Sequence, residues 1–354
     1  MKTRTQMICT VAAALALMAI APLFAGDLNP PAGPVVPTHK TLTEVEPRMA
    51  ISASYTPGDA DSVFKITQPG SYYLTGNISG VAGKHGIEIT ASGISLDLNG
   101  FDMQGIAGTL DGVIANVASL RNIAVFNGSV RSWGGAGVNL LGAATFSARV
   151  TDLVASNNSG DGIRAGNGST VLNCAAYANT GGGIVANQGC TISSCAAYEN
   201  GGNGISAGFG STVSNCSTFT NSGNGISVSA GCTVVHCSAR GNTLDGILCA
   251  SAGNTIIANT CSGNGNGGDG AGIHLTGGDN RVEGNNCTGA DRGIDVDNVG
   301  NWIVRNICSG NTTNWDVVVN NKCFVVLGVN GGAINGDSGG TSPGSTDPSA
   351  NFTY

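Results

Sequence analysis

The sequence has few charged and few aromatic residues, and both shortages narrow the range of functions. Only 10% of its 354 residues are charged and 5% are aromatic. Its 15 basic residues form no basic stripe, the formal net charge is −7, and no aromatic residues are grouped for base stacking. We therefore expect no nucleic-acid partner. The shortage of aromatic residues also requires a core built from Ile, Val, Ala and Cys.

Two apolar patterns are also missing. No stretch has the 3.6-residue apolar spacing of an amphipathic helix, and after the N-terminus no run is apolar enough to span a bilayer. At the N-terminus, Lys2 and Arg4 precede an apolar run from Met7 to Phe24, which is typical of an export signal. A membrane anchor is the alternative. We expect cleavage after about Ala25 and an exported protein, periplasmic, on the cell surface or extracellular, without a membrane span.

Glycine is abundant, with 57 residues, and part of it marks a repeat. Ten Gly-Ile or Gly-Val pairs lie 21, 25 or 26 residues apart, and they begin at Gly86, Gly112, Gly137, Gly162, Gly183, Gly204, Gly225, Gly246, Gly272 and Gly293. This period, with short β-branched runs and Gly/Asn/Ser turns, is typical of one β unit stacked on copies of itself. We predict an all-β fold, a parallel β-helix or β-solenoid of about ten coils with 21–26 residues per coil.

The repeat divides the chain into four segments. We expect a signal peptide over residues 1–25 and a Pro-rich, flexible leader over residues 26–54. The β-helix with its entry cap is expected over residues 55–330, followed by a Gly- and Ser-rich C-terminal tail over residues 331–354. The repeat covers most of the mature chain, so we expect one elongated domain rather than two. The pattern gives no oligomeric state and leaves open whether the tail docks.

Aligned on the Gly-Ile pairs, the repeats place similar residues in columns, because side chains alternate along a strand and successive coils stack. One column is cysteine and then asparagine: Cys174, Cys195, Cys216, Cys237, Asn259, Asn285 and Asn306. Another holds Asn179, Asn200, Asn221, Asn242, Asn264 and Asn311. Stacked asparagines can satisfy one another's amides, so we predict an asparagine ladder.

Eleven cysteines remain after removal of the signal peptide. Exported cysteines usually pair, but neighbours in a stacked column lie about 4.8 Å apart, whereas a disulfide needs about 3.8 Å between Cβ atoms. We therefore expect buried thiols that act as small apolar side chains. Cys190, Cys232 and Cys323, at turns or near the end, are the expected reactive thiols. No CxxC pair occurs, and we predict no metal site built from these cysteines and no evident cofactor.

The Gly-Ile openings, the Val-x-Asn-Cys runs and the asparagine column resemble bacterial right-handed parallel β-helix proteins of the pectin-lyase-like superfamily, over roughly Val63 to Val329. Residues 66–74 and 96–101 and the end of the tail are similar to a secreted, largely uncharacterised branch. The resemblance implies a carbohydrate-associated role, polysaccharide binding or processing, and, for an enzyme, a polysaccharide lyase or glycoside hydrolase. A non-catalytic cell-surface, structural or adhesin-like solenoid is the alternative.

Outward-facing charged residues gather near one end of the repeat. His274, Asp295 and Asp297 lie on adjacent coils, beside a 26-residue coil that carries the insertion 263–270. Such groups could perform acid–base chemistry on a sugar, so they are the candidate catalytic residues. Carboxylates at this spacing could also hold Ca²⁺. The competing interpretation is a plain cross-strand pair on a solvated face.

We expect Asp269, Asp279 and Arg292 to wall this site and to contact a polysaccharide or surface glycan. Residues 242–247 resemble the Asn-Thr-Asp-Gly motif of polygalacturonases, with Leu244 inserted. The paired aspartates, Gly-His-Gly and Arg-Ile-Lys expected further on are absent, as are the motifs of pectate lyases. No complete catalytic set is visible, so the sequence leaves enzyme and binding protein open.

Overall fold

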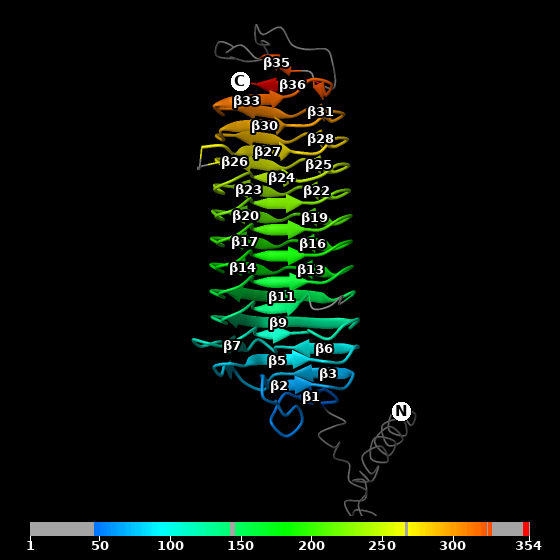
Figure 1. Ribbon diagram of the computed structural model, residues 1–354, viewed down its shortest axis with the longest axis vertical. Coiled ribbons are helices and arrows are strands. Elements are labelled where there is room, and N and C mark those ends of the chain that lie inside the picture. Colours follow the sequence, from blue (N-terminus) through cyan, green and yellow to red (C-terminus); the bar gives the residue numbers. More distant parts are fainter. Residues whose placement is uncertain (1–45, 142–145, 266–267, 324, 328–349, 354) are drawn as a thin grey trace, which may run out of the picture. The chain divides into compact units, whose positions relative to one another are not determined.

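The computed structural model describes residues 46–141, 146–265, 268–323, 325–327 and 350–353. The described residues from Arg48 onward belong to one compact unit. Its described part winds into a solenoid of short strands whose coils stack in a column (Figure 1). The expected signal peptide, most of the leader and most of the tail lie outside the described residues. Within the described ranges, no helix is long and apolar enough to cross a membrane.

A typical coil has three strands, and equivalent strands of successive coils pair in parallel to give three faces, here called faces I, II and III. Face I is a separate sheet of twelve strands. These are β2 (Ser62–Ile66), β5 (His85–Ile89), β8 (Val113–Ile114), β10 (Val138–Leu140), β12 (Ile163–Ala165), β15 (Ile184–Ala186), β18 (Ile205–Ala207), β21 (Ile226–Val228), β24 (Ile247–Cys249), β27 (Ala271–Leu275), β30 (Arg292–Val296) and β33 (Thr313–Val317).

Face II follows face I within each coil. Its strands are β1 (Met49–Ala50), β3 (Gly70–Tyr73), β6 (Ile94–Asp97), β13 (Thr170–Leu172), β16 (Thr191–Ser193), β19 (Thr212–Ser214), β22 (Thr233–Val235), β25 (Thr255–Ile257), β28 (Arg281–Glu283), β31 (Trp302–Val304) and β34 (Lys322–Cys323). Strands β9 (Ile123–Arg131) and β11 (Arg149–Ser156) run on into face III and join both faces into one 24-stranded sheet.

Face III completes each coil. Its strands are β4 (Ile78–Ser79), β7 (Asp102–Gln104), β14 (Ala175–Tyr177), β17 (Ala196–Tyr198), β20 (Ser217–Phe219), β23 (Ser238–Arg240), β26 (Thr260–Ser262), β29 (Asn286–Thr288), β32 (Ile307–Ser309), β35 (Val325–Leu327) and β36 (Asn351–Thr353). Strand β36 pairs with β32 and β35, so residues 351–353 of the expected tail belong to the solenoid. Strand β1 likewise lies inside the expected leader and pairs with β3.

The all-β parallel solenoid predicted from the repeat is confirmed, but it has about 13 turns rather than ten. The additional turns lie at the two ends. There, β2 and β33 pair with face I although neither begins with a Gly-Ile or Gly-Val pair. Hydrogen bonding to the neighbouring coil is enough to hold these strands in the sheet, so the sequence signature undercounts the coils.

The predicted apolar columns fill the interior. Ile163, Ile184 and Ile205 pair in register on face I and are fully buried. Parallel in-register stacking places each side chain directly over its equivalent in the next coil, so one residue type can pack along the whole column. The largest buried side chain, Trp133, is an exception to a core of small residues, and its Nε1 donates a hydrogen bond to the carbonyl oxygen of Met103 at 3.0 Å.

Asparagine ladders line the corners. From Asn158 to Asn264, each Nδ2 donates to the Oδ1 of the asparagine one coil further on, at 2.9 Å. The cysteine column continues as a second ladder, Asn259, Asn285, Asn306 and Asn351. A third ladder, absent from the prediction, is Asn254, Asn280, Asn301 and Asn321. Asn311 departs from its expected column neighbours, because it donates to Asn314 within its own coil.

The eleven described cysteines are free thiols, and ten of them are buried. The expectation of reactive thiols at Cys190 and Cys232 is wrong, since both are 1% exposed. Their side chains occupy the interior of the corner between faces I and II, where each Sγ donates to a carbonyl oxygen of the previous coil, at 3.1 Å to Gly166 and 3.2 Å to Gly208. Burial raises the pKa of both thiols.

Candidate functional site

Face I places His274 beside a run of carboxylates. His274 lies in β27, in register with Leu248 of β24 and Asp295 of β30. Asp295 is in turn in register with Asp316 of β33. Because successive equivalent residues of a parallel sheet point to the same side, these four residues form one outward column. The predicted proximity of His274 and Asp295 therefore follows from strand register.

Three carboxylates surround the imidazole of His274. Its Nδ1 lies 3.1 Å from Oδ2 of Asp245, and its Nε2 lies 3.1 Å from Oδ2 of Asp297. The Nε2 is also 3.7 Å from Oδ2 of Asp295. The side chains of Asp245 and Asp295 are 9% and 8% exposed, whereas that of Asp297 is 57% exposed. The contacts of His274 with Asp245 and Asp295 are therefore shielded from water, whereas its contact with Asp297 is exposed to solvent.

Asp245 was missing from the predicted site. It lies in the connection from face III to face I, and its Oδ1 accepts a hydrogen bond from the backbone N–H of Ala271 at 2.8 Å. In the same way, Oδ1 of Asn224 accepts a hydrogen bond from the backbone N–H of Asp245, and Oδ1 of Asn203 accepts one from the N–H of Asn224. The position is thus a recurring link between coils, and at Asp245 its second oxygen meets a histidine at hydrogen-bond distance. The equivalent Asp111 also links two coils, but its second oxygen lies 3.7 Å from Nδ1 of His85. The signal was present in the polygalacturonase-like segment 242–247.

The carboxylates favour the charged form of His274. They raise its pKa from 6.5 to about 9, with the hydrogen bond to Asp245 as the largest cause and burial acting in the opposite direction. The imidazole is therefore an imidazolium at neutral pH. Burial raises the pKa of Asp295 above its ordinary value, while the nearby positive charges of His274 and Arg292 oppose this. The site thus holds a cationic proton donor beside a partly desolvated carboxyl group.

Arg292 links three acidic residues on the same face. Its guanidinium forms ion pairs with Asp269, with Asp295 at 3.3 Å and with Asp316 at 3.0 Å. The structure therefore brings together the predicted Arg292 and Asp269 and adds Asp316. The predicted Asp279 does not join this group, because it lies in the corner after β27, with a left-handed φ of 56°, whereas Asp269 precedes the same strand.

Five carboxylates at this site face two cationic side chains, so it carries an excess of negative charge. One nitrogen or oxygen from each of His274, Asp295 and Asp297 lies within 4.8 Å of the others, close enough to share a metal ion. Ca²⁺ prefers oxygen ligands, and a protonated imidazole cannot ligate a metal. The imidazolium instead supplies the positive charge among these carboxylates.

A second cluster, Asp59, Asp61 and Glu88, has the same compactness near the N-terminal end of the described solenoid. Here a lysine already supplies the balancing charge. The Nζ of Lys65 lies 2.6 Å from Asp59 and 2.8 Å from Glu88. These ion pairs raise the pKa of Lys65, which therefore stays charged. The lysine pairs with two of the three carboxylates, so this cluster is an ordinary ion-pair network. The His274 site is therefore the stronger functional candidate.

The comparisons with known proteins support the fold. A family model described as the right-handed β-helix region matches residues 77–244, and curated protein sequences give no match. The A-module of the Azotobacter vinelandii mannuronan C-5 epimerase AlgE4 is 17% identical, with a TM-score of 0.53, over 69% of this chain and 88% of that one.

Two further solved structures have a similar fold. The Dettilon tailspike protein is 14% identical, with a TM-score of 0.51 over 83% of this chain and 60% of that one. The Agl-KA catalytic domain is also 14% identical, with a TM-score of 0.52 over 73% of this chain and 57% of that one. The chain thus spans less than two thirds of these two proteins. The parallel strands, the matched family model and these structures together show that the chain has the right-handed parallel β-helix fold.

Proposed function

We propose that the protein binds and processes a polysaccharide on the outward side of face I, with His274, Asp295 and Asp297 as the catalytic group. The observation that carries the proposal is the imidazolium of His274, held between Asp245 and Asp297 with Asp295 at 3.7 Å. A proton donor and carboxylate acceptors on one outward face are the groups that acid–base cleavage of a glycosidic bond uses.

The roles follow from exposure and charge. Asp245 orients His274 from the sheltered side and maintains its charge, because it both links two coils and contacts Nδ1. His274 then offers the Nε2 proton to the leaving oxygen of a sugar. Asp295 and Asp297 are the proton acceptors, and their close approach to His274 leaves less room than the roughly 6.5–9.5 Å between the carboxyl groups of an inverting glycosidase. An elimination suits the site better, in which one carboxylate removes a proton from the sugar while His274 protonates the leaving oxygen. In a retaining reaction one of the two carboxylates would instead attack the anomeric carbon as the leaving oxygen takes the proton from His274.

The likeness to other solved structures supports a carbohydrate-associated role in general terms. The epimerase module described above is named for its action on mannuronan, a polysaccharide. The fold hosts several functions, so the likeness supports a carbohydrate-associated role without a particular reaction. Export, through the segment before residue 26, belongs to the same proposal, because an exported protein would meet polysaccharides of the cell surface or of the surroundings.

The negative charge of the site suggests that neutral and acidic polysaccharides differ in their need for Ca²⁺. Its excess of carboxylates repels an acidic polysaccharide, and Ca²⁺ bound to Asp297 and Asp316, which are 57% and 53% exposed, would reduce that repulsion. We therefore propose that Ca²⁺ is dispensable for neutral polysaccharides and assists acidic ones. Asp269 and Arg292, joined by an ion pair beside the site, would contact the bound chain. The role proposed for Asp279 is not supported by its position.

The test is an incubation of the protein with neutral and acidic polysaccharides, with and without Ca²⁺, followed by assays for new reducing ends and for unsaturated ends. We expect product from the unaltered chain and a loss of at least about 100-fold in His274→Ala and Asp295→Asn. Ser227→Ala is the matched control, since Ser227 lies in the same outward column two coils away. Product that survives both site substitutions would refute the catalytic assignment.

The alternative is a non-catalytic solenoid that only retains a glycan or contacts neighbouring molecules. One observation favours it: between the two charged ends, the outward column of face I is Val185, Ser206, Ser227 and Leu248, which offers no acid or base. Retention of a polysaccharide without any product in the same incubation would support this alternative.

A further inference from the structure

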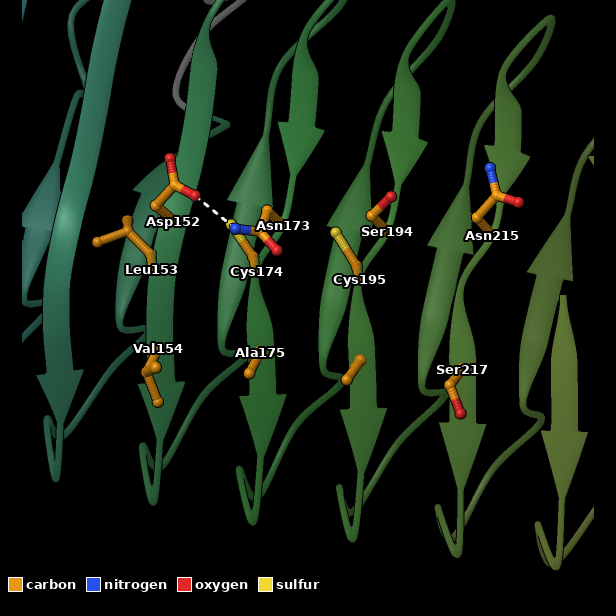
Figure 2. Close-up of a pocket in the computed structure, with 11 residues that line it drawn as sticks. Asp152, Leu153, Val154, Asn173, Cys174, Ala175, Ser194, Cys195, Asn215 and Ser217 are labelled. Carbon is orange, nitrogen blue, oxygen red and sulfur yellow. Dashed lines mark hydrogen bonds between the residues drawn. The ribbon is translucent and has the colours of Figure 1, made fainter.

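A shallow groove lies on the opposite part of the solenoid, at the corner between faces II and III. It has a volume of about 610 Å³ and runs across four successive coils. Figure 2 shows two parallel rows of its lining residues, one at the corner and one on face III. The corner row is Asp152, Asn173, Ser194 and Asn215, and the face III row is Val154, Ala175, Ala196 and Ser217.

The backbone explains why the corner row faces outward. Each corner residue of this row has a left-handed conformation, with φ of 54° in all four coils. A single left-handed residue turns the chain sharply, and here it leaves a polar, exposed side chain at the rim. The row therefore offers hydrogen-bonding groups at one position per coil, and the coils are about 4.8 Å apart.

Aromatic side chains continue the surface beside the groove. Tyr177, Tyr198 and Phe219 lie two residues after the face III row and are in register with one another, so they point to the same side. The rings of Tyr177 and Tyr198 stack with centroids 4.9 Å apart and planes 4° apart. Stacking covers the ring faces that the two tyrosines turn toward each other, so the pair offers ring edges and hydroxyl groups to a ligand above the sheet. The expectation that the chain lacks stacked aromatic residues is thus wrong.

We propose that this groove binds a linear, neutral polysaccharide that lies along the solenoid axis. The residues of the groove, the polar rim and the aromatic border all repeat once per coil. The spacing between coils, about 4.8 Å, is close to the length of one sugar residue in an extended polysaccharide. Such a ligand can repeat the same contacts in each coil: hydroxyl groups at the rim, and apolar carbon atoms against Ala175, Ala196 and the ring edges.

The charge of the lining indicates a neutral ligand. Asp152 is the only charged residue among those that line the groove, and it already accepts a hydrogen bond from Asn173 at 2.5 Å. No lysine or arginine lines the groove, and the guanidinium of Arg240 lies outside it, over the ring of Phe219 at 5.9 Å. Acidic polysaccharide and single-stranded nucleic acid are therefore poorer matches, although aromatic stacks occur in nucleic-acid sites.

This groove is independent of the His274 site, which lies on face I, and either can fail without the other. A purely structural role for the rings would also be consistent with stacking, since cross-strand aromatic pairs stabilise a sheet. The experiment must therefore separate binding from stability.

The test is affinity electrophoresis of the whole protein through gels that contain hydroxyethyl cellulose, xylan or galactomannan, with polygalacturonate and a single-stranded oligonucleotide as competitors. We expect at least one neutral polysaccharide to retard the protein, and Ala196→Phe, which fills the middle of the groove, to weaken binding at least tenfold. Tyr198→Ala should also weaken it. Ser238→Phe is the matched control, because Ser238 occupies the equivalent position one coil beyond the groove and should leave binding unchanged.

Several results would overturn the proposal. These are no retardation by any of the three neutral polysaccharides, equal retardation of Ala196→Phe and the unaltered protein, or binding displaced only by the oligonucleotide. A dimer that dissociates in Tyr198→Ala would show that the surface joins two copies instead. Melting temperatures of all variants identify any that do not fold, and Ser217→Phe then replaces Ala196→Phe. Loss of activity in His274→Ala with unchanged retardation would separate the two sites.

Discussion

Asp245→Asn should lower the pKa of His274 without disturbing the coil around it. The substitution removes the carboxylate that contributes most to the charge of the imidazole. Asparagine keeps an oxygen that can accept the hydrogen bond from Ala271, just as Asn224 accepts one from the N–H of Asp245 in the preceding coil. The change is therefore close to a removal of charge alone.

The pH dependence has a definite sign. The pKa of His274 rises from 6.5 to about 9 on folding, so its charged form stabilises the folded state. This contribution is fully present below pH 6.5 and is lost as the pH rises through 9. At about 1.4 kcal/mol for each tenfold change in proton affinity, it amounts to about 3 kcal/mol. Asp295 and Asp297 remain in the variant, so we expect a loss of about 1–2 kcal/mol at pH 6.

Two measurements test this prediction. A proton NMR titration should show the pKa of His274 moving toward 6.5 in Asp245→Asn, and urea unfolding should show a stability difference at pH 6 that shrinks by pH 9.5. Asp297→Asn is the control, since its carboxylate is 57% exposed and contributes less. An unchanged pKa of His274, or an equal stability difference at both pH values, would refute the assignment of Asp245.

Two other predictions concern the interior. Asn221→Ala leaves the buried N–H and Nδ2 of Asn200 without their acceptor, so we expect a loss of about 2–4 kcal/mol in urea unfolding; a loss below 0.5 kcal/mol would mean that the ladder contributes little. A thiol-reactive dye should label at most one of the eleven cysteines from Cys174 to Cys323 in the native protein, namely the half-buried Cys323, and all of them in denaturant. Rapid native labelling of Cys190 or Cys232 would contradict their burial.

The fold was largely predictable because a solenoid converts sequence spacing directly into contact. Residues one period apart, such as Ile163 and Ile184, lie in register, so the repeat itself assigns strand pairing. The ends were less predictable. Strand β1 is held by pairing with β3 rather than by any recurring motif. Strand β36 continues an asparagine ladder through Asn351, but Asn351 lies 45 residues from Asn306, so the repeat spacing does not predict this pairing.

The candidate site was predicted only in part. His274 and Asp295 belong to one column and were found, whereas Asp245 belongs to the connection that precedes its strand and reaches the imidazole from the side. Aligning the repeats predicts contacts between equivalent positions of successive coils. It does not predict a contact between two different positions, such as that of Asp245 with His274. The aromatic border had a clear signal that was missed, because Tyr177, Tyr198 and Phe219 are spaced by one 21-residue period.

The sequence by itself determined the architecture, the burial of most cysteines and the asparagine ladders, since these depend on side chains that repeat at a fixed interval. Only the tertiary structure decided which polar groups meet across columns: Asp245 with His274, and Asp269 and Asp316 with Arg292. It also decided that the corner and face III enclose a groove. The physical reason is that spacing fixes distances along the axis, while contacts around a coil depend on how sharply each corner turns.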